Sequence, residues 1–272
     1  MRVLLTNDDG IEATGLQALR VALVAIPGIE LVVIAPDGNR SAMARMITTG
    51  RPLWVQEVPF DDGTVGYATD GTPVDCVRFG QLGLVPGFEP DIVVAGINHG
   101  SNLGDDVTYS GTVAAAFEGL ILGLPAIAVS QQSTEREMDF RFGRTFEFEA
   151  AAQFTARVVE ELDDVPLPAG TLLNINVPGK HPTGVDVTRL GKRIYRDELQ
   201  LETDAGEGKR RYWIYGDDPG WHDEPGTDLA AVAGGRISIT PVHFDLTDAG
   251  SLDALAAHDL ARLLTPAARD LQ

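Results

Sequence analysis

Short apolar runs alternate with helical patterns along the first half of the chain. Unbroken apolar runs stand at Val3–Leu5 and Leu31–Ile34 and inside Asp91–Asn98, which is typical of strands buried on both faces. Between the first two runs, leucines recur at three- and four-residue spacing from 16 to 23, which indicates a helix. The alternation predicts an α/β fold, a Rossmann-like, doubly wound and mostly parallel sheet covered by helices.

Other segments add elements to this plan. Thr72 followed by Pro73 predicts a helix start, and a helix rich in small residues follows from about Thr112 to Leu122. The interval from Met46 to Thr69 breaks the rhythm and predicts a hairpin. Aromatic and apolar residues spaced by fours from Phe142 to Leu162 predict one long helix.

The second half is less regular after the strand Leu172–Val177. Residues from about 191 to 230 are polar, rich in glycine and carry several aromatic side chains, which suggests a projecting arm. A strand at 235–240 and a closing helix at Leu252–Leu264 follow. We therefore expect a single domain over 1–272, with a Rossmann-like core at 1–190, an arm at 191–230, and a returning strand and C-terminal helix at 231–272.

Composition narrows the class of protein. The 272 residues are 44% hydrophobic, which is enough to form a buried core. The net charge of −19 disfavours a duplex nucleic-acid partner, because binding one needs a basic face. The single cysteine, Cys76, excludes an internal disulfide framework and a cysteine-rich zinc site. No apolar run reaches the ~18 residues of a membrane span, and the first residues do not resemble a signal peptide. We expect a cytoplasmic protein with no membrane contact.

Oxygen-bearing side chains follow three of the predicted strands. Asn7–Gly10 comes after the first, Asp37–Ser41 after the second and Asn98–Asn102 at the end of the third. Each stretch alone could be a turn, a loop or a helix cap. Because the carboxyl ends of parallel strands share one edge of a sheet, we expect the three to meet. Carboxylate, hydroxyl and amide oxygens without paired His or Cys favour a hard cation, Mg, Mn or Ca, rather than zinc.

A candidate anion site follows these residues. Ser110, Gly111 and Thr112 stand where the small-residue helix begins, and free backbone N–H groups at a helix N-terminus attract phosphate. The alternative is a serine cap on a tightly packed helix. A phosphate cradle beside a cation is the pairing that phosphoester hydrolysis needs, and the cation explains how an acidic chain holds an anion.

Eight stretches along the chain carry the motifs of one known family. They are Leu4–Gly10, Ala35–Ser41, Gly71–Val77, Pro90–Asn98, Leu103–Val107, Tyr109–Ala116, Leu173–Pro178 and Ile239–His243. At these residues the sequence resembles the SurE family, stationary-phase survival proteins that act as metal-dependent 5′-nucleotidases. The chain departs from the family at Gly38, where a basic residue is common, and in the variable segment His99–Ser101.

The resemblance implies a function and a set of site residues. It implies one divalent cation per subunit, Mg or Mn, with ligands at Asp8, Asp9, Ser41 and Asn98. It places the phosphate near Ser110, Gly111 and Thr112. The implied substrates are nucleoside 5′-monophosphates, with 3′-monophosphates and short polyphosphate as further candidates. It also implies a cytoplasmic homodimer or homotetramer in which a C-terminal arm is exchanged.

Our hypothesis for the reaction is in-line attack of an activated water on the phosphate. Asp8 or Asp9 orients or deprotonates that water, and Asn98 with the amides of 110–112 holds the phosphoryl oxygens. Which aspartate is the base stays open.

Four further residues are candidates for a supporting role around this site. They are Asn7, Asn39, Arg40 and His243. Arg40 either steers phosphate or covers the surface, and His243 is either a proton donor or a structural histidine. Glu118, within the small-residue helix, could also support the site, although a packing role is expected.

Two other readings remain open. A phosphatase with an aspartyl-phosphate intermediate also begins at an acidic strand end, but it normally uses two aspartates separated by one residue. A non-catalytic nucleotide-binding or sensing module is the alternative from another class, although both common glycine-rich phosphate loops are absent.

Overall fold

The computed structural model describes residues 1–138, 143–162, 164, 168–196, 198–214 and 219–264. Within them the main sheet has nine strands in the order β3-β4-β2-β1-β5-β6-β7-β13-β8. Their bounds are β1 Arg2–Thr6, β2 Glu30–Pro36, β3 Val55–Pro59, β4 Val65–Thr69, β5 Ile92–His99, β6 Ala126–Gln131, β7 Thr171–Val177, β8 Val185–Val187 and β13 Ile237–His243. The neighbouring strands β4, β2, β1, β5, β6 and β7, in sheet order, all pair in parallel. The pairs β3–β4 and β13–β7 are antiparallel. The predicted α/β, mostly parallel sheet is confirmed.

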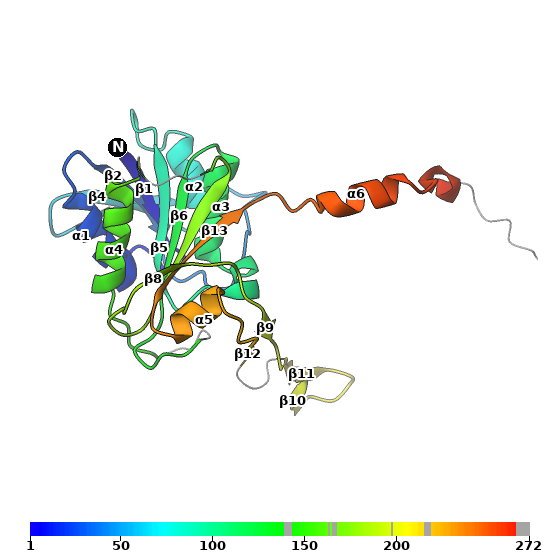
Figure 1. Cartoon of the computed structure of the whole chain (residues 1–272). Helices are drawn as coiled ribbons and strands as arrows, with labels where there is room; N and C mark the ends of the chain where they lie inside the picture. The colour runs from blue at the N-terminus through cyan, green and yellow to red at the C-terminus, as the bar shows by residue number, and fades with distance from the viewer. Residues whose placement is uncertain (139–142, 163, 165–167, 197, 215–218, 265–272) are drawn as a thin grey trace, which may run out of the picture.

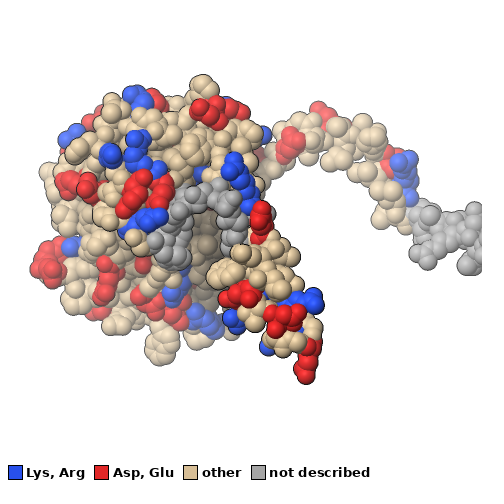
Figure 2. All heavy atoms as spheres, turned by 90° about the horizontal axis from the view of Figure 1, so that it is seen from below, with Lys and Arg blue, Asp and Glu red and all other residues tan. Residues whose placement is uncertain are grey.

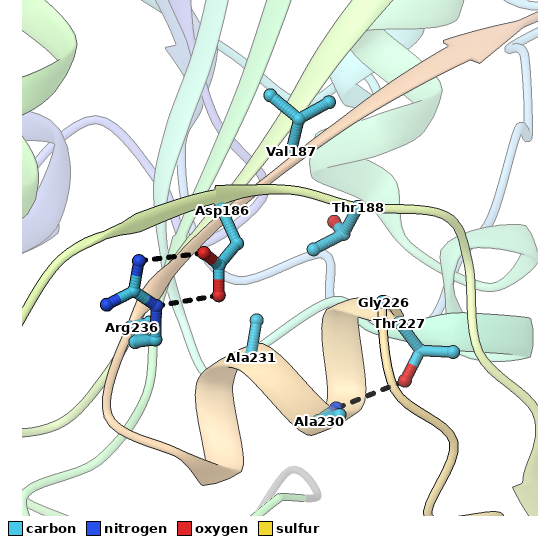
Figure 3. Close-up of a pocket in the computed structure, with 8 residues that line it drawn as sticks. All are labelled: Asp186, Val187, Thr188, Gly226, Thr227, Ala230, Ala231 and Arg236. Atoms are coloured by element: carbon cyan, nitrogen blue, oxygen red, sulfur yellow. Dashed lines mark hydrogen bonds and ion pairs between the residues drawn. The ribbon is translucent and has the colours of Figure 1, made fainter.

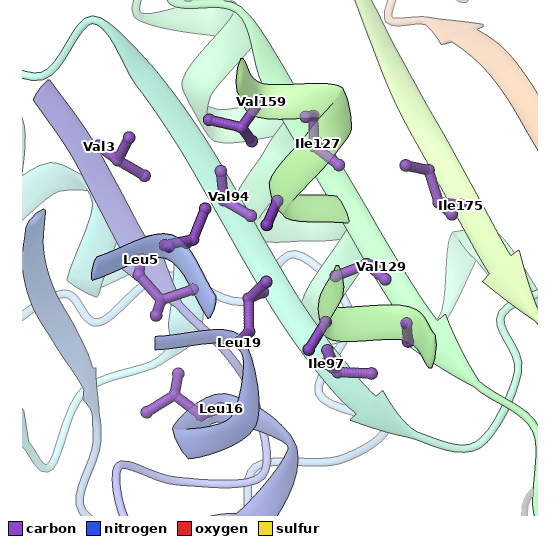
Figure 4. Packing of buried hydrophobic residues seen from close by; sticks show 14 of the residues in the cluster. Val3, Leu5, Leu16, Leu19, Val94, Ile97, Ile127, Val129, Val159 and Ile175 are labelled. Atoms are coloured by element: carbon purple, nitrogen blue, oxygen red, sulfur yellow. The ribbon is translucent and has the colours of Figure 1, made fainter. Parts of the chain in front are cut away.

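Helices cover both faces of this sheet (Figure 1). Helices α1 (Thr14–Val24) and α4 (Glu149–Glu160) contact each other on one face, and α2 (Pro73–Gln81) and α3 (Gly111–Ile121) on the other. Successive strand residues point to opposite faces, so β1 sends Val3 and Leu5 under α1 and α4 and Leu4 under α2. Figure 4 shows the first of these two cores. Strand β1 lies between β2 and β5, so the connections after β1 and after β5 lead to opposite sides of the sheet. Such a reversal leaves a crevice at the carboxyl ends of β1 and β5.

Local signals explain several boundaries. Thr72 caps α2, and the side chain of Asp75 accepts from the Thr72 backbone N–H, which is the capping arrangement that the sequence predicts. The hairpin expected within 46–69 is formed by β3 and β4. The long helix is shorter than predicted, because α4 begins only at Glu149. Phe146 and Phe148 precede it and stack on each other, with ring centroids 5.8 Å apart. Phe142 lies outside the described residues.

The arm forms small strands of its own. Strand β9 (Arg193–Ile194) pairs with β12 (Gly220–Trp221), and between them β10 (Gln200–Asp204) pairs with β11 (Arg210–Trp213). The β10–β11 hairpin projects from the body (Figure 1). Helix α5 (Asp228–Ala233) then leads back into β13.

The C-terminal segment is helical but does not close the fold. Helix α6 (Ala249–Ala256) and the short 3₁₀ helix η2 (Leu260–Leu264) contain no buried residue. They extend away from the body as a tail (Figure 1, Figure 2). The predicted closing helix was therefore wrong in its packing, because a leucine-rich pattern indicates an apolar face without saying which surface covers it.

On the face shown in Figure 2, acidic and basic side chains are interspersed. Among the described residues, no helix is both long and apolar enough to cross a bilayer.

Candidate metal and phosphate site

Three strand ends and one helix start converge on a single cavity of about 390 Å³. Asp8 follows β1, Ser41 lies in the loop after β2, and Asn98 is near the end of β5. All three line this cavity together with Ser110, which caps α3. The structure thus brings together residues that are up to 102 positions apart in the sequence, at the crevice where ligands bind in doubly wound sheets.

Asp8 is the most buried carboxylate of the cluster, at 3% exposure. The hydroxyl of Thr112 donates a hydrogen bond to it. The pKa of Asp8 is raised to about 6. Burial is the main cause and the negative charge of Asp9 contributes, while the hydrogen bond from Thr112 opposes the rise. Two carboxylates held this close are costly to ionise without a positive charge between them.

Asp9 lies beside Asp8 and is held from two directions. Its carboxylate accepts from the His99 backbone N–H at 3.0 Å and from Asn39 Nδ2 at 3.3 Å. His99 Nδ1 is a further 3.3 Å contact. These contacts tie the end of β1 to the end of β5 and to the loop after β2.

The turn after β1 depends on close backbone packing. Gly10 has a φ of +109°, and a Cβ there would lie 3.0 Å from the Cα of Gly38. The Asn7 side chain both donates to the Gly10 carbonyl at 2.9 Å and accepts from its N–H at 3.2 Å. Asn7 therefore shapes the turn that presents the two aspartates.

The loop after β2 is joined to the same turn. The Arg40 backbone N–H donates to the Asp8 carbonyl at 2.6 Å, and the Ser41 N–H donates to Asn39 Oδ1 at 2.9 Å. The guanidinium of Arg40 forms an ion pair with Asp37 at 2.6 Å, so in this structure it is engaged with Asp37 and not with Asp8 or Asp9.

Asn98 and α3 complete the cluster. The amide nitrogen of Asn98 donates to the Gly100 carbonyl at 2.8 Å, so the oxygen is the atom suited to a cation. Ser110 Oγ accepts from the Val113 N–H at 3.1 Å as the helix cap. A Cβ on Gly111 would lie 2.7 Å from Asp8 Oδ2, so the first turn of α3 packs directly against the Asp8 carboxylate.

The donor set fits a hard divalent cation. Two carboxylates, one amide oxygen and one hydroxyl are the oxygen ligands that Mg and Mn prefer. In the part of the chain that is described, no group of three or more His, Cys, Asp or Glu side chains is placed to hold a metal. The observation that favours a cation here is geometric, because Asp8 is buried directly beside a second carboxylate, Asp9.

The chain is similar to known proteins over nearly its full length. The family model described as "Survival protein SurE" matches residues 3–197, more than half of the chain. The chain belongs to the SurE family. The "5′-nucleotidase SurE" of Rubrobacter xylanophilus is 53% identical over 269 residues, covering 97% of this chain and 99% of that protein. The "5′-nucleotidase SurE" of Pelotomaculum thermopropionicum is 48% identical over 91% of each chain. The crystal structure of the SurE protein from Aquifex aeolicus is similar with a TM-score of 0.78 and 37% identity, covering 97% of this chain and all of that one.

His243 is a predicted residue of this SurE-family chain that lies far from the cluster, and Asp9 lies beside Asp8 without lining the cavity. His243 ends β13, where it pairs with Thr171 at the start of β7. The amino end of β7 lies at the sheet edge opposite the carboxyl ends of the parallel strands. In this structure His243 therefore stands away from Asp8 and Asn98.

Several cavity residues were not singled out from the sequence. They are Ala42, Asp106, Tyr109 and Pro219, whereas Ser101 and Asn102 belong to the stretch Asn98–Asn102 that the sequence places at this edge. Asn102 is held by buried polar partners, since its N–H donates to Asn176 Oδ1 and its side chain to Ser130 Oγ, both at 2.8 Å. The signal that could have found this network is the polar Asn174 and Asn176 inside an otherwise apolar strand, because buried amides need partners.

A second cavity of similar size, about 390 Å³, lies beside α5 and β8 (Figure 3). Its charged groups satisfy each other, because Arg236 donates to both carboxylate oxygens of Asp186 at 2.7 and 2.8 Å. None of the predicted site residues lines it. The residues that the sequence predicts for the site therefore gather at the first cavity and not at this one.

Proposed function

We propose that this protein is a divalent-cation-dependent 5′-nucleotidase that hydrolyses nucleoside 5′-monophosphates to nucleoside and phosphate. The observation that carries the proposal is the meeting of Asp8, Ser41 and Asn98 in one cavity at the N-terminus of α3. The names of the curated relatives, at 53% and 48% identity over nearly the full length, support the same activity.

The cation ligands in this proposal are Asp8, Asp9, Ser41 and Asn98. A bound divalent cation neutralises phosphoryl oxygens and lowers the pKa of a coordinated water toward ~7. Asp8 lines the cavity, whereas Asp9 is turned to Asn39 and His99. This difference favours Asp8 as the carboxylate that orients the attacking water and Asp9 as the one that stays fixed.

The phosphate contacts in this proposal come from α3 and β5. The backbone N–H groups of residues 110–112 and the second side-chain N–H of Asn98, the one not donated to Gly100, stabilise charge on the phosphoryl oxygens as it develops. Tyr109 lines the same cavity and is 61% exposed, so its ring is available to pack against the nucleoside. Pro219 brings the arm to this wall.

A phosphate-release screen tests the activity. Nucleoside 5′-monophosphates, 3′-monophosphates and short polyphosphate are each incubated with Mg or Mn, with EDTA as the control. We expect fastest release from the 5′-monophosphates, loss of release with EDTA and its return when Mg or Mn is restored. Hydrolysis that survives chelation would contradict the cation site. Nucleotide binding without release would instead support a binding module, and a trapped aspartyl-phosphate would support the covalent mechanism.

We further propose that the protein is a homo-oligomer that uses the arm and the tail. Large apolar side chains on both are exposed in the single chain, namely Tyr212, Trp213, Ile214, Leu252, Leu255, Leu260, Leu263 and Leu264. Single chains rarely leave so many apolar groups in water unless a partner covers them. The cytoplasmic location stays a prediction.

Shortening the chain tests the tail. A protein of residues 1–246 lacks α6 and η2, which contribute nothing buried, so it should fold with an unchanged circular dichroism spectrum apart from the lost helix. Light scattering should give it fewer subunits than the full chain. An unchanged subunit number would show that the tail does not hold the assembly together.

A further inference from the structure

The loop that carries Ser41 has an unfavourable backbone conformation. It runs from 37 to 54, between β2 and β3, without helix or strand. Ala42 and Ala44 have φ values of +60° and +48°, which residues with a side chain rarely adopt. Such a conformation persists only where surrounding contacts impose it. The contacts of this loop therefore decide where Ser41 stands.

One set of contacts ties the loop to the start of α2. Thr48 donates to the Asp75 carboxylate through its N–H at 3.1 Å and its hydroxyl at 2.7 Å. The Met46 carbonyl accepts from the Thr72 hydroxyl at 2.7 Å. The carboxylate that caps α2 thus also holds the middle of the loop.

A second set ties the loop to α3. The Ala44 N–H donates to the Tyr109 carbonyl at 3.2 Å. Arg45 lies 3.8 Å from Glu118, a carboxylate on α3 that is 1% exposed. The guanidinium of Arg45 also lies over the Phe244 ring, 4.4 Å from its centroid.

Two arginine side chains compensate the charge of the buried Glu118 carboxylate. Arg78 of α2 is 2.7 Å from one of its oxygens and Arg45 is 3.8 Å from the other. Removing a partner from a buried carboxylate destabilises the fold. The contact with Glu118 therefore favours the observed position of Arg45, and with it the position of the loop that carries Arg45. Glu118 is seven residues after Gly111, or about 10 Å along the helix, so the same helix that packs on Asp8 also positions the loop of Ser41.

We propose that Arg45 and Glu118 are positioning residues that hold Ser41 at the cation site. The proposal rests on the proposed function in one respect, that Ser41 is a cation ligand. Neither Arg45 nor Glu118 lines the cavity, so both act on the cation through the loop.

The test measures the affinity for Mn²⁺ by isothermal titration calorimetry. Arg45→Met keeps the packing on Phe244 and removes the charge of a side chain that is 35% exposed. Arg78 stays 2.7 Å from Glu118, so the buried carboxylate keeps its nearer arginine and the variant should fold. We expect about tenfold weaker Mn²⁺ binding, as for other residues that orient a ligand. Arg45→Lys should recover most of the affinity. The defect should lie in the Mn²⁺ requirement, with kcat near the wild-type value at saturating Mn²⁺.

Combination with Ser41→Ala shows whether the effect passes through Ser41. If it does, Arg45→Met weakens Mn²⁺ binding in the wild-type background but changes it less than twofold in the Ser41→Ala background. Equal weakening in both backgrounds, or none in the wild type, overturns the proposal. The proposal is also overturned if Ser41→Ala binds Mn²⁺ as tightly as the wild type does. The nucleotidase function is tested independently, by phosphate release from nucleoside 5′-monophosphates with the wild-type protein.

Two further variants guard the interpretation. Glu118→Gln removes the same ion pair from the α3 side, together with the 2.7 Å pair to Arg78, and should reproduce the weaker binding. Asp186→Asn breaks an Arg–carboxylate pair at the second cavity (Figure 3) and should bind Mn²⁺ as the wild type does. A loss of affinity in Asp186→Asn would show that any broken ion pair has this effect and would overturn the specific role of Arg45.

Discussion

Asp8→Asn should lower kcat for a nucleoside 5′-monophosphate by about 10³-fold or more. The substitution neutralises the carboxylate that faces the cavity and that we propose as a cation ligand. Losing about 4 kcal/mol of transition-state stabilisation corresponds to that factor. Asparagine keeps the size of the side chain and can still accept from Thr112. Phosphate release at saturating Mg²⁺ measures the effect.

The variant should nevertheless stay folded. Burial raises the pKa of Asp8 from 3.8 to about 6 in the protein without metal, so above about pH 6 the ionised carboxylate opposes folding. Asparagine removes that opposition, and the metal-free variant should unfold at the same or a higher temperature than the metal-free wild type at about pH 7.5. A lower unfolding temperature would attribute the lost activity to the fold.

A matched aspartate controls for the loss of charge. Asp91 stands at the opposite sheet edge, before β5, where it accepts from the Arg2 N–H at 2.6 Å. Asp91→Asn should keep wild-type turnover. Full activity in Asp8→Asn would remove the basis of the proposed site.

Gly111→Ala should lower kcat by about 10²-fold. The added Cβ would lie 2.7 Å from Asp8 Oδ2 and 2.8 Å from Asp8 Cβ, both closer than carbon normally approaches other atoms, so the carboxylate must move. A displacement on the order of 1 Å in a reacting group costs about that factor. The same change alters the backbone next to the proposed phosphate position.

Gly250→Ala provides the control for Gly111→Ala. Gly250 also lies in the first turn of a helix, α6, and its nearest neighbour is the Asp248 side chain at 3.3 Å, away from the cavity. Steady-state phosphate release should be unchanged in this variant. If Gly111→Ala were as active as Gly250→Ala, the packing of α3 on Asp8 would not affect turnover.

Much of the core and the family can be predicted from local patterns. Continuous apolar runs at Val3–Leu5 and Leu31–Ile34 appear as the central strands β1 and β2. The capping residues Thr72 and Asp75 begin α2 as predicted, because a cap uses only neighbours in the chain. The match to the SurE family model confirms the resemblance drawn from the motifs.

Other expectations failed or lacked a local signal. Phe146 fits a helical repeat, yet it lies before α4 and stacks on Phe148, because its ring also packs against His99 with centroids 5.3 Å apart. His243 follows a motif strand, but β13 runs antiparallel to β7 and carries it to the far edge of the sheet. Strand direction depends on pairing between distant segments, which periodicity does not encode.

The sequence by itself determined which segments are strands and helices in the core, and which oxygen-bearing residues follow the strands, because both depend on residues close together in the chain. Tertiary structure decided that Asp8, Ser41 and Asn98 share one cavity, that Gly111 packs on Asp8, and that Arg45 reaches Glu118. The physical reason is that burial and charge pairing act between residues that only the folded sheet brings together.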